Sequence, residues 1–311
     1  MSHKLDDVLE AVLESYTMHP HITKIGETQF PKRHLILAAL KKLQYVIFPG
    51  FFDQKELRSD NIRFYTGQLL EEISEVLTAQ IAKTLRLFTE AYCDAPDDVV
   101  QKRAEEIVDA FLSAIPKIRE YLATDIEAAF EGDPAAFSRD EVISSYPGIY
   151  ATMVNRIAHE LYTLGVPLIP RIMTEHAHSV TGIDIHPGAK IGKYFFIDHG
   201  TGIVIGETAE IGEHAKIYQG VTLGALSTRG GQLLKGKKRH PTIEDDVTIY
   251  SGASILGGET VISGGAVIGG NAFVTKSVPE QTRVSAKMPE LQFKRNENVE
   301  FLNGEFLNYE I

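Results

Sequence analysis

The sequence of 311 residues contains a single cysteine, Cys93. One thiol excludes a framework of disulfide bonds within the chain, and it excludes a metal site built from several cysteines. Cys93 lies in a stretch with helical periodicity. Because free cysteine is among the most buried residue types, we expect a buried or half-buried helix position.

Basic residues and long apolar runs are also scarce. Lys and Arg number 31 against 42 Asp and Glu, the net charge is -11, and no basic stripe is present, so nucleic acid is not an expected partner. No apolar run approaches the roughly 20 residues that a membrane-spanning helix needs. The opening Met-Ser-His-Lys-Leu-Asp-Asp lacks the apolar core of a signal peptide, so we expect a cytoplasmic protein.

The hydrophobic pattern changes once along the chain. Up to about residue 178, apolar residues such as Leu69 and Ile73 repeat at helical spacing. Beyond that point, small apolar residues return every six positions. We therefore predict an α+β protein with a helical N-terminal domain over 1–178, a repeat domain over 179–280 and a C-terminal tail over 281–311.

The six-residue period predicts a parallel β-helix, in which three strand-and-turn steps complete one triangular coil and stacked coils bury one another's apolar residues. The period-six columns are Ile185, Ile191, Ile197 and Ile203, then Ile205, Ile211, Ile217 and Leu223, and then Ile243, Ile249, Ile255, Val261, Val267 and Phe273. Small or short polar residues fit corners that need positive φ. The expected corner residues are Gly192, Asp198, Gly206, Gly212, Asp246, Gly252, Gly264 and Gly270. After Pro279 the repeats are expected to stop.

Segment 224–240 is the large break in this repeat. It is too long for a corner turn, and loops of this length inside a compact domain are often functional. Its five cations indicate either a solvated loop or a positive arm over an anionic ligand. They are Arg229, Lys235, Lys237, Lys238 and Arg239.

Histidine and aspartate recur on the first coils. Asp184 and His199 fall on successive coils, which the strand spacing places about 5 Å apart. A carboxylate beside an imidazole is the arrangement of an oriented general base. A hydrogen-bonded corner histidine is the plainer alternative. A metal site is disfavoured, because the H-x-x-x-x-H spacing expected for two ligands one step apart is absent.

Several blocks closely resemble the serine O-acetyltransferase family, in family order from about 130 to 280. They are Asp133-Pro-Ala, Arg156-Ile-Ala-His159-Glu-Leu-Tyr, Asp184-Ile-His186-Pro-Gly-Ala, Ile197-Asp198-His199-Gly-Thr-Gly, Gln219-Gly-Val-Thr-Leu-Gly224 and Arg239-His240-Pro241. The resemblance implies a left-handed β-helix and acetyl transfer from acetyl-CoA to the hydroxyl of L-serine, giving O-acetyl-L-serine for cysteine biosynthesis. Residues 1–125 look like the helical extension of longer family members.

The resemblance also implies roles for particular residues. His199 would be the general base and Asp184 its orienting carboxylate, with no enzyme nucleophile required. Asp133 and Asp198 match positions suited to the ammonium of the serine zwitterion. A helix cap is the alternative for Asp133.

The serine carboxylate would be bound by Arg239 and His240, with Arg able to pair it bidentately; simple loop residues are the alternative. Acetyl-CoA enters as a co-substrate, and no permanently bound cofactor is implied. A backbone N–H near Gly224 and Ala225 is a candidate oxyanion donor. Positions that match the family's CoA channel are Ser251, Gly252, Gly269 and Gly270, with Lys276 a candidate for a phosphate.

The resemblance further implies a homotrimer with each active site between two subunits, or a hexamer doubled through the helical domain. It implies cysteine inhibition and the binding of C-terminal Ile311 to O-acetylserine sulfhydrylase, for which a frayed end is the alternative. Other functions are an acyltransferase for a sugar or amine, or a non-catalytic scaffold that docks through its tail. The pair Asp133 and Arg239 favours a zwitterion over a sugar, and the presence of Asp184 and His199 favours an enzyme over a scaffold.

Overall fold

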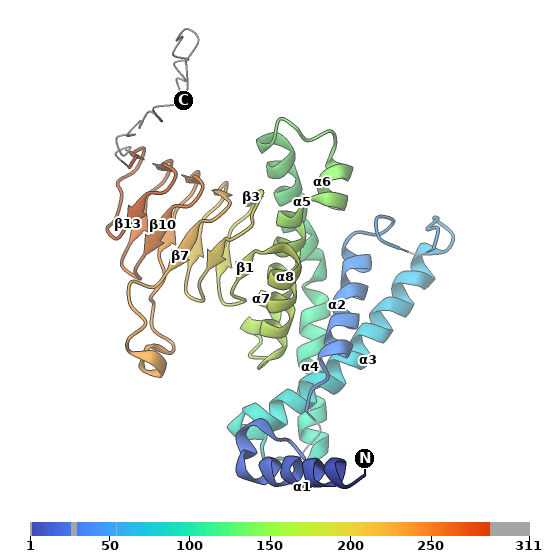
Figure 1. Ribbon diagram of the computed structural model, residues 1–311. Helices are drawn as coiled ribbons and strands as arrows, with labels where there is room; N and C mark the ends of the chain where they lie inside the picture. The colour runs from blue at the N-terminus through green and yellow to red at the C-terminus, as the bar shows by residue number, and fades with distance from the viewer. Residues whose placement is uncertain (1, 26–29, 54, 287–311) are drawn as a thin grey trace, which may run out of the picture.

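The computed structural model describes residues 2–25, 30–53 and 55–286. Helices α1 to α8 come first, and short strands β1 to β14 then wind into stacked coils (Figure 1). The helices are α1 Ser2–Met18, α2 Arg33–Ile47, α3 Ile62–Phe88, α4 Asp97–Ser113, α5 Ile115–Gly132, α6 Arg139–Ser145, α7 Pro147–Thr163 and α8 Ile169–Thr181, with short 3₁₀ turns η1 Pro20–Ile22, η2 Glu90–Tyr92 and η3 Gly231–Leu234. Over the described residues, no helix has both the length and the apolar character to cross a bilayer.

Local sequence signals explain where the helices near the coils begin and end. Proline at the start of α5 and of α7 fits a first turn, because those N–H groups have no partner within a helix. Ser138 caps α6 by accepting a hydrogen bond from the Glu141 N–H at 3.1 Å. The last helix ends at Thr181, slightly beyond residue 178, and Gly182 closes it with φ 72°.

The strands form three parallel sheets, and successive strands of a sheet come from successive coils. Their orders are β1-β4-β7-β10-β13, β2-β5-β8-β11 and β3-β6-β9-β12-β14. The strands are β1 Asp184–Ile185, β2 Lys190–Ile191, β3 Phe196–Asp198, β4 Val204–Ile205, β5 Glu210–Ile211, β6 Lys216–Tyr218, β7 Thr222–Gly224, β8 Thr242–Ile243, β9 Thr248–Ile249, β10 Ser254–Leu256, β11 Val261–Ile262, β12 Val267–Ile268, β13 Phe273–Val274 and β14 Arg283–Val284. The predicted helical part followed by a parallel β-helix is confirmed.

The apolar column is displaced by one residue in the last coils. Ile262, Ile268 and Val274 are buried, whereas Phe273, which we expected inside, is 72% exposed. Val261 and Val267, also expected inside, are only half-buried. The cause is one extra residue at the corner after β10, since the inward residues Ile255 and Ile262 are seven rather than six positions apart. The coil also continues past 280, because β14 pairs with β12.

Two other expectations are wrong. Of the eight expected corner residues, only Asp246 and Gly252 have positive φ, because the left-handed residue usually lies elsewhere in the turn. Cys93 is exposed rather than buried. Helix α3 ends before it, and Cys93 follows the η2 turn, where its Sγ lies 3.5 Å from the Thr89 carbonyl oxygen.

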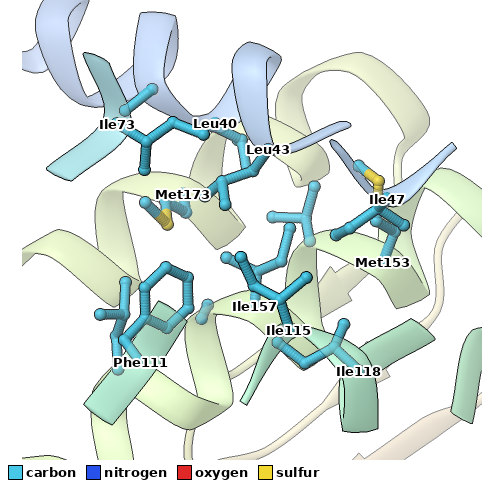
Figure 2. Close-up of a cluster of buried hydrophobic side chains, with 14 of the residues drawn as sticks. Leu40, Leu43, Ile47, Ile73, Phe111, Ile115, Ile118, Met153, Ile157 and Met173 are labelled. Carbon is cyan, nitrogen blue, oxygen red and sulfur yellow. The ribbon is translucent and has the colours of Figure 1, made fainter. Parts of the chain in front are cut away.

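The buried hydrophobic side chains form two clusters, one among the helices and one inside the coils. Figure 2 shows the helical cluster, in which side chains from α2, α3, α4, α5, α7 and α8 meet. Its labelled members are Leu40, Leu43, Ile47, Ile73, Phe111, Ile115, Ile118, Met153, Ile157 and Met173. The second cluster fills the coils and includes Ala151 of α7, while Phe196 of β3 belongs to the helical cluster. Helices α5, α7 and α8 therefore pack directly on the first coil.

Candidate active site

The corner between β3 and β4 is longer than the corresponding corners of later coils. Five residues (199–203) separate β3 from β4, whereas three (219–221) separate β6 from β7. Backbone hydrogen bonds of 2.8–3.0 Å align Thr201-Gly202 with Gln219-Gly220, Ser251-Gly252 and Gly270-Asn271. His199 and Gly200 are therefore a two-residue insertion. We call this column of corners the His199 corner.

The inserted residues project the imidazole out of the coil. His199 has φ 56°, which is uncommon for a residue with a side chain, and Gly200 has φ 90°. A Cβ at Gly200 would lie 2.5 Å from Ile183 Cδ1 and 2.9 Å from Ile197 Cγ2. Glycine is therefore required here both by the positive φ and by the lack of space for a side chain. The His199 side chain is 71% exposed in the single chain. Backbone of this kind is often retained where it serves function.

Asp198 and Asp184 are the two carboxylates to compare as partners of His199. Asp198 Oδ1 lies 3.7 Å from His199 Nδ1, and the Asp198 side chain is 15% exposed. Asp184 begins β1, and no hydrogen bond within the described residues joins it to His199. The dyad of Asp184 and His199 therefore stays a prediction, and Asp198 is the carboxylate that the single chain places beside the imidazole.

Asp184 instead lies beside side chains of α8. One of its carboxylate oxygens is within 4.8 Å of ligand atoms of Glu175 and His178. These residue types can bind a metal, but Glu175 already pairs with Arg171 at 2.5 Å and with His178 at 3.6 Å.

Asp133 ends α5 beside the His199 corner. Its Oδ1 accepts a hydrogen bond from the Ala135 N–H at 2.8 Å, and its Oδ2 accepts one from the Tyr146 hydroxyl. The hydrogen bond from Tyr146, followed by that from Ala135 and the nearby charges of His199 and Lys216, lowers the pKa of Asp133. Asp133 is therefore ionised and within electrostatic range of His199, as binding of an ammonium near the imidazole would require.

Lys216 fixes the end of α5 against the coils. Its Nζ donates to the Gly132 carbonyl oxygen at 2.8 Å, and it lies over the rings of Phe196 and Tyr218 at 4.8 and 5.2 Å from their centroids. Helix α5 therefore presents Asp133 at a defined height over β3 and β6.

Arg239 and His240 lie at a different corner, between the sheets of β4 and β5. We call the column of residues 206–209, 225–241, 257–260 and 275–277 the Arg239 corner. Arg239 Nη2 pairs with Glu207 Oε2, and Glu207 Oε1 accepts a hydrogen bond from the Tyr162 hydroxyl at 2.9 Å. Burial opposes ionisation of Glu207, but its bonds from Arg239 and Tyr162 outweigh burial and lower its pKa. Arg239 Nη1 is buried without a hydrogen-bond partner among the described residues.

Thr208 fixes the backbone and the tautomer at His240. Its Oγ1 accepts hydrogen bonds from the N–H groups of Arg239 at 2.9 Å and His240 at 3.0 Å. The Thr208 N–H donates to His240 Nδ1 at 3.0 Å, so that nitrogen is an acceptor and the ring proton is on Nε2. Burial, followed by the charge of Arg239, lowers the pKa of His240 to about 4. His240 is therefore a neutral donor through Nε2.

The predicted serine site is thus divided within one chain. Charges near Asp133 are those of His199 and Lys216, whereas charges near His240 are those of Arg239, Glu207, His186 and Lys238. Strand β4 (Val204–Ile205) separates the two corners.

The expected CoA positions divide in the same way. On the His199 corner are Ser251, Gly252, Gly269 and Gly270; Gly224 ends β7 where it enters the Arg239 corner, and Ala225 and the exposed Lys276 lie on that corner. Arg229, Lys235, Lys237 and Lys238 of the loop are all exposed, and Lys238 Nζ donates a hydrogen bond to the Thr208 carbonyl oxygen at 2.7 Å.

Five residues at these corners had no predicted role. Tyr162 ends one of the quoted family blocks, and Glu207 and Thr208 follow the expected corner residue Gly206, which is the signal that could have pointed to them. Tyr146 and Lys216 carry no signal in the sequence, because their importance depends on how α7 and β6 meet α5.

The chain is similar in sequence to the plasmid serine acetyltransferase of Synechococcus elongatus, 44% identical over 257 residues that cover 80% of this chain and 81% of that protein. The chain belongs to the serine acetyltransferase family. No family model matches the chain. Membership makes acetylation of the serine hydroxyl the activity of this protein.

Solved structures agree with this assignment. Serine acetyltransferase isoform 3 of Entamoeba histolytica, in complex with cysteine, is 38% identical with a TM-score of 0.70, covering 95% of this chain and 96% of that chain. The Neisseria gonorrhoeae serine acetyltransferase in complex with serine is 27% identical with a TM-score of 0.53, covering 85% and 98%.

Proposed function

We propose that the protein transfers the acetyl group of acetyl-CoA directly to the serine hydroxyl, in a site that two neighbouring subunits of a trimer share. The separation of Asp133 and His199 from Arg239 and His240 carries this proposal. One serine zwitterion needs both signs of charge within a few ångströms, and one chain holds them at different corners. Cyclic packing of three β-helices would set the His199 corner of one chain against the Arg239 corner of the next.

Serine would bind by its two charged groups. Asp133 and Asp198 would accept hydrogen bonds from the ammonium. The carboxylate would take donors from Arg239 and from His240 Nε2. The buried and unpartnered Nη1 of Arg239 supports this assignment, because a buried guanidinium N–H without an acceptor is costly unless a ligand supplies one.

His199 would act as the general base. The serine hydroxyl is a weak nucleophile at neutral pH, and a positioned imidazole that takes its proton as the new C–O bond forms is worth roughly 10²–10⁴-fold in rate. Asp184 or Asp198 would stabilise the resulting imidazolium. A backbone N–H near Gly224 and Ala225 would bind the oxyanion of the tetrahedral intermediate. Collapse of the tetrahedral intermediate breaks the C–S bond of the thioester, and the imidazolium gives its proton to the departing CoA thiolate.

Mixed trimers test the shared site. His199→Ala alone should lower kcat about 10²–10⁴-fold, and Arg239→Ala alone should raise the KM for serine. Co-expressed with different affinity tags and purified through both, the two variants should recover activity, because every trimer that holds both variants has an intact His199 corner against an intact Arg239 corner at about one of its three interfaces. CoA release from serine and acetyl-CoA at low serine gives the rate.

A second mixture makes the outcome decisive. Wild-type chains mixed equally with the double variant His199→Ala/Arg239→Ala should give about one quarter of full activity if sites are shared, and about one half if each chain holds its own site. No recovery by the single variants, together with one-half activity here, would refute sharing.

A complex with O-acetylserine sulfhydrylase through Ile311 is also proposed. Ile311 lies outside the described residues, and the proposal rests on a terminal carboxylate and one apolar side chain, which suit a small pocket. Deleting Ile311 should abolish co-elution with the sulfhydrylase without changing serine acetylation.

A further inference from the structure

Tyr146 lies at the start of α7, where the chain is pressed against β3. Pro147 begins the helix, and Gly148 follows. A Cβ at Gly148 would lie 2.7 Å from the Ile197 carbonyl oxygen, so only glycine allows the helix to approach β3 this closely. Because β3 ends at Asp198, this approach brings the start of α7 close to the end of β3 that leads into the His199 corner.

The Tyr146 hydroxyl is committed to Asp133. It donates to Asp133 Oδ2, while the Ala135 N–H occupies Oδ1. The hydrogen bond to Asp133, followed by burial, raises the pKa of Tyr146 to about 12, so the hydroxyl remains a donor. Each carboxylate oxygen has two lone pairs. Asp133 is therefore held from both sides and keeps acceptor capacity for a ligand.

Both candidate ammonium ligands act electrostatically on Tyr146. Asp133, Glu141 and Asp198 each contribute to its raised pKa, and the charges of His199 and Lys216 act on Asp133. Tyr146 is thus a neutral donor bonded to Asp133 and within electrostatic range of Asp198. Without it, Asp133 would retain only the Ala135 hydrogen bond and could rotate toward Lys216.

We propose that Tyr146 is a positioning residue for the amino group of the substrate, which holds Asp133 toward the His199 corner and thereby selects alcohols that carry an ammonium. This rests on the proposed binding of the serine ammonium by Asp133. Tyr146 does not touch the reacting atoms, so its effect is on substrate binding rather than on proton transfer.

Tyr146→Phe removes only the hydroxyl. The KM for L-serine should rise about tenfold, the size expected for loss of one hydrogen bond to a charged group. Both kcat and the KM for acetyl-CoA should stay within about twofold. Tyr150→Phe is the matched control, one turn further along α7. The pKa of Tyr150 is raised by burial alone, and over the described residues its hydroxyl makes no hydrogen bond. The KM of the Tyr150→Phe variant for serine should therefore not change.

Two further measurements separate positioning from general structure. Tyr146→Phe should have no added effect in an Asp133→Asn background, since it acts through Asp133. The inhibition constant of 3-hydroxypropionate, which lacks the ammonium, should be unchanged by Tyr146→Phe.

An equal loss for serine and 3-hydroxypropionate, additive effects with Asp133→Asn, or an unchanged KM for serine would each overturn the proposal. Failure of the proposed function looks different: there, Asp133→Asn itself would leave the KM for serine unchanged.

Discussion

Replacing Asp125 by asparagine should weaken the junction between the helices and the coils. Asp125 is fully buried, and its two oxygens receive hydrogen bonds from Arg156 Nε at 2.6 Å and Nη2 at 2.7 Å. Arg156 also donates to the carbonyl oxygens of Ile191 and Gly192, and the Phe195 N–H donates to Asp125 at 2.9 Å. Asparagine keeps the shape but leaves the guanidinium charge buried without a countercharge.

The expected cost follows from burial. Removing one partner of a buried ion pair costs about 3–5 kcal/mol, because the remaining charge is uncompensated. At roughly 2–4 °C per kcal/mol for a chain of this order of size, the unfolding temperature should fall by roughly 6–20 °C. Glu127→Gln is a matched control. Arg139 also pairs with Glu127 through two hydrogen bonds, of 2.6 and 2.5 Å, but this pair lies at the surface, with side chains 52% and 33% exposed. Exposed pairs contribute about 0–1 kcal/mol.

Thermal unfolding followed by circular dichroism, at one fixed protein concentration, compares the two variants. Asp125→Asn should also lose activity below its own unfolding temperature, because α5 carries Asp133 and α7 carries Tyr146. Equal shifts for Asp125→Asn and Glu127→Gln would refute the argument from burial. Replacing Asp125 and Arg156 together by leucine and methionine should not restore stability, because the carbonyl oxygens of Ile191 and Gly192 would then lack donors.

Two predictions concern the Arg239 corner. Thr208→Val removes the acceptor of two backbone N–H groups, so the KM for serine should rise about tenfold or more, since each unsatisfied N–H costs about 1–3 kcal/mol; an unchanged KM would contradict the role of Thr208, and steady-state kinetics measures it. The pKa of His240 is lowered to about 4 by burial, so the unfolded chain binds the proton more readily than the folded one. The stability contributed by neutral His240 is therefore present above its ordinary value near 6.5 and is lost as pH falls toward about 4. Unfolding temperatures measured across this range should drop less in His240→Gln, and an identical drop in both proteins would contradict the lowered pKa.

The period of the hydrophobic residues was sufficient to predict most of the fold. It identified the inward residues from Ile185 to Ile255, because a strand step and its turn take six residues wherever corners are regular. It failed at Phe273, because the sequence does not reveal the additional corner residue after β10. In the strands that follow, the position six residues on and the position seven residues on are both apolar, so the period cannot tell which of them points inward. Positive φ could not be placed either, since the sequence does not say which residue of a turn takes the left-handed conformation.

Site residues were predictable where one coil carries them. Asp198 and His199 come together through local sequence, and Arg239 and His240 stand side by side in the chain. What the sequence could not supply is the contact between elements. The Tyr146 hydrogen bond to Asp133 depends on the packing of α5 against α7, and no periodicity records which polar side chains such packing brings together.

A break in the six-residue period nevertheless indicates where the candidate site lies. Inward residues are six apart at the regular corners and seven apart at the corner after β10, but Ile197 and Ile205 are eight apart, and the two additional residues are His199 and Gly200. The corner at 219–221 turns the chain without two such residues, so the insertion is not required for the coil to close. Deleting His199 and Gly200 together should give a corner like that at 219–221, with an unfolding temperature within about 4 °C of the unmodified protein and no serine acetylation. Loss of the coil on deletion, measured by circular dichroism, would show that the insertion is structural and that the irregularity does not mark the site.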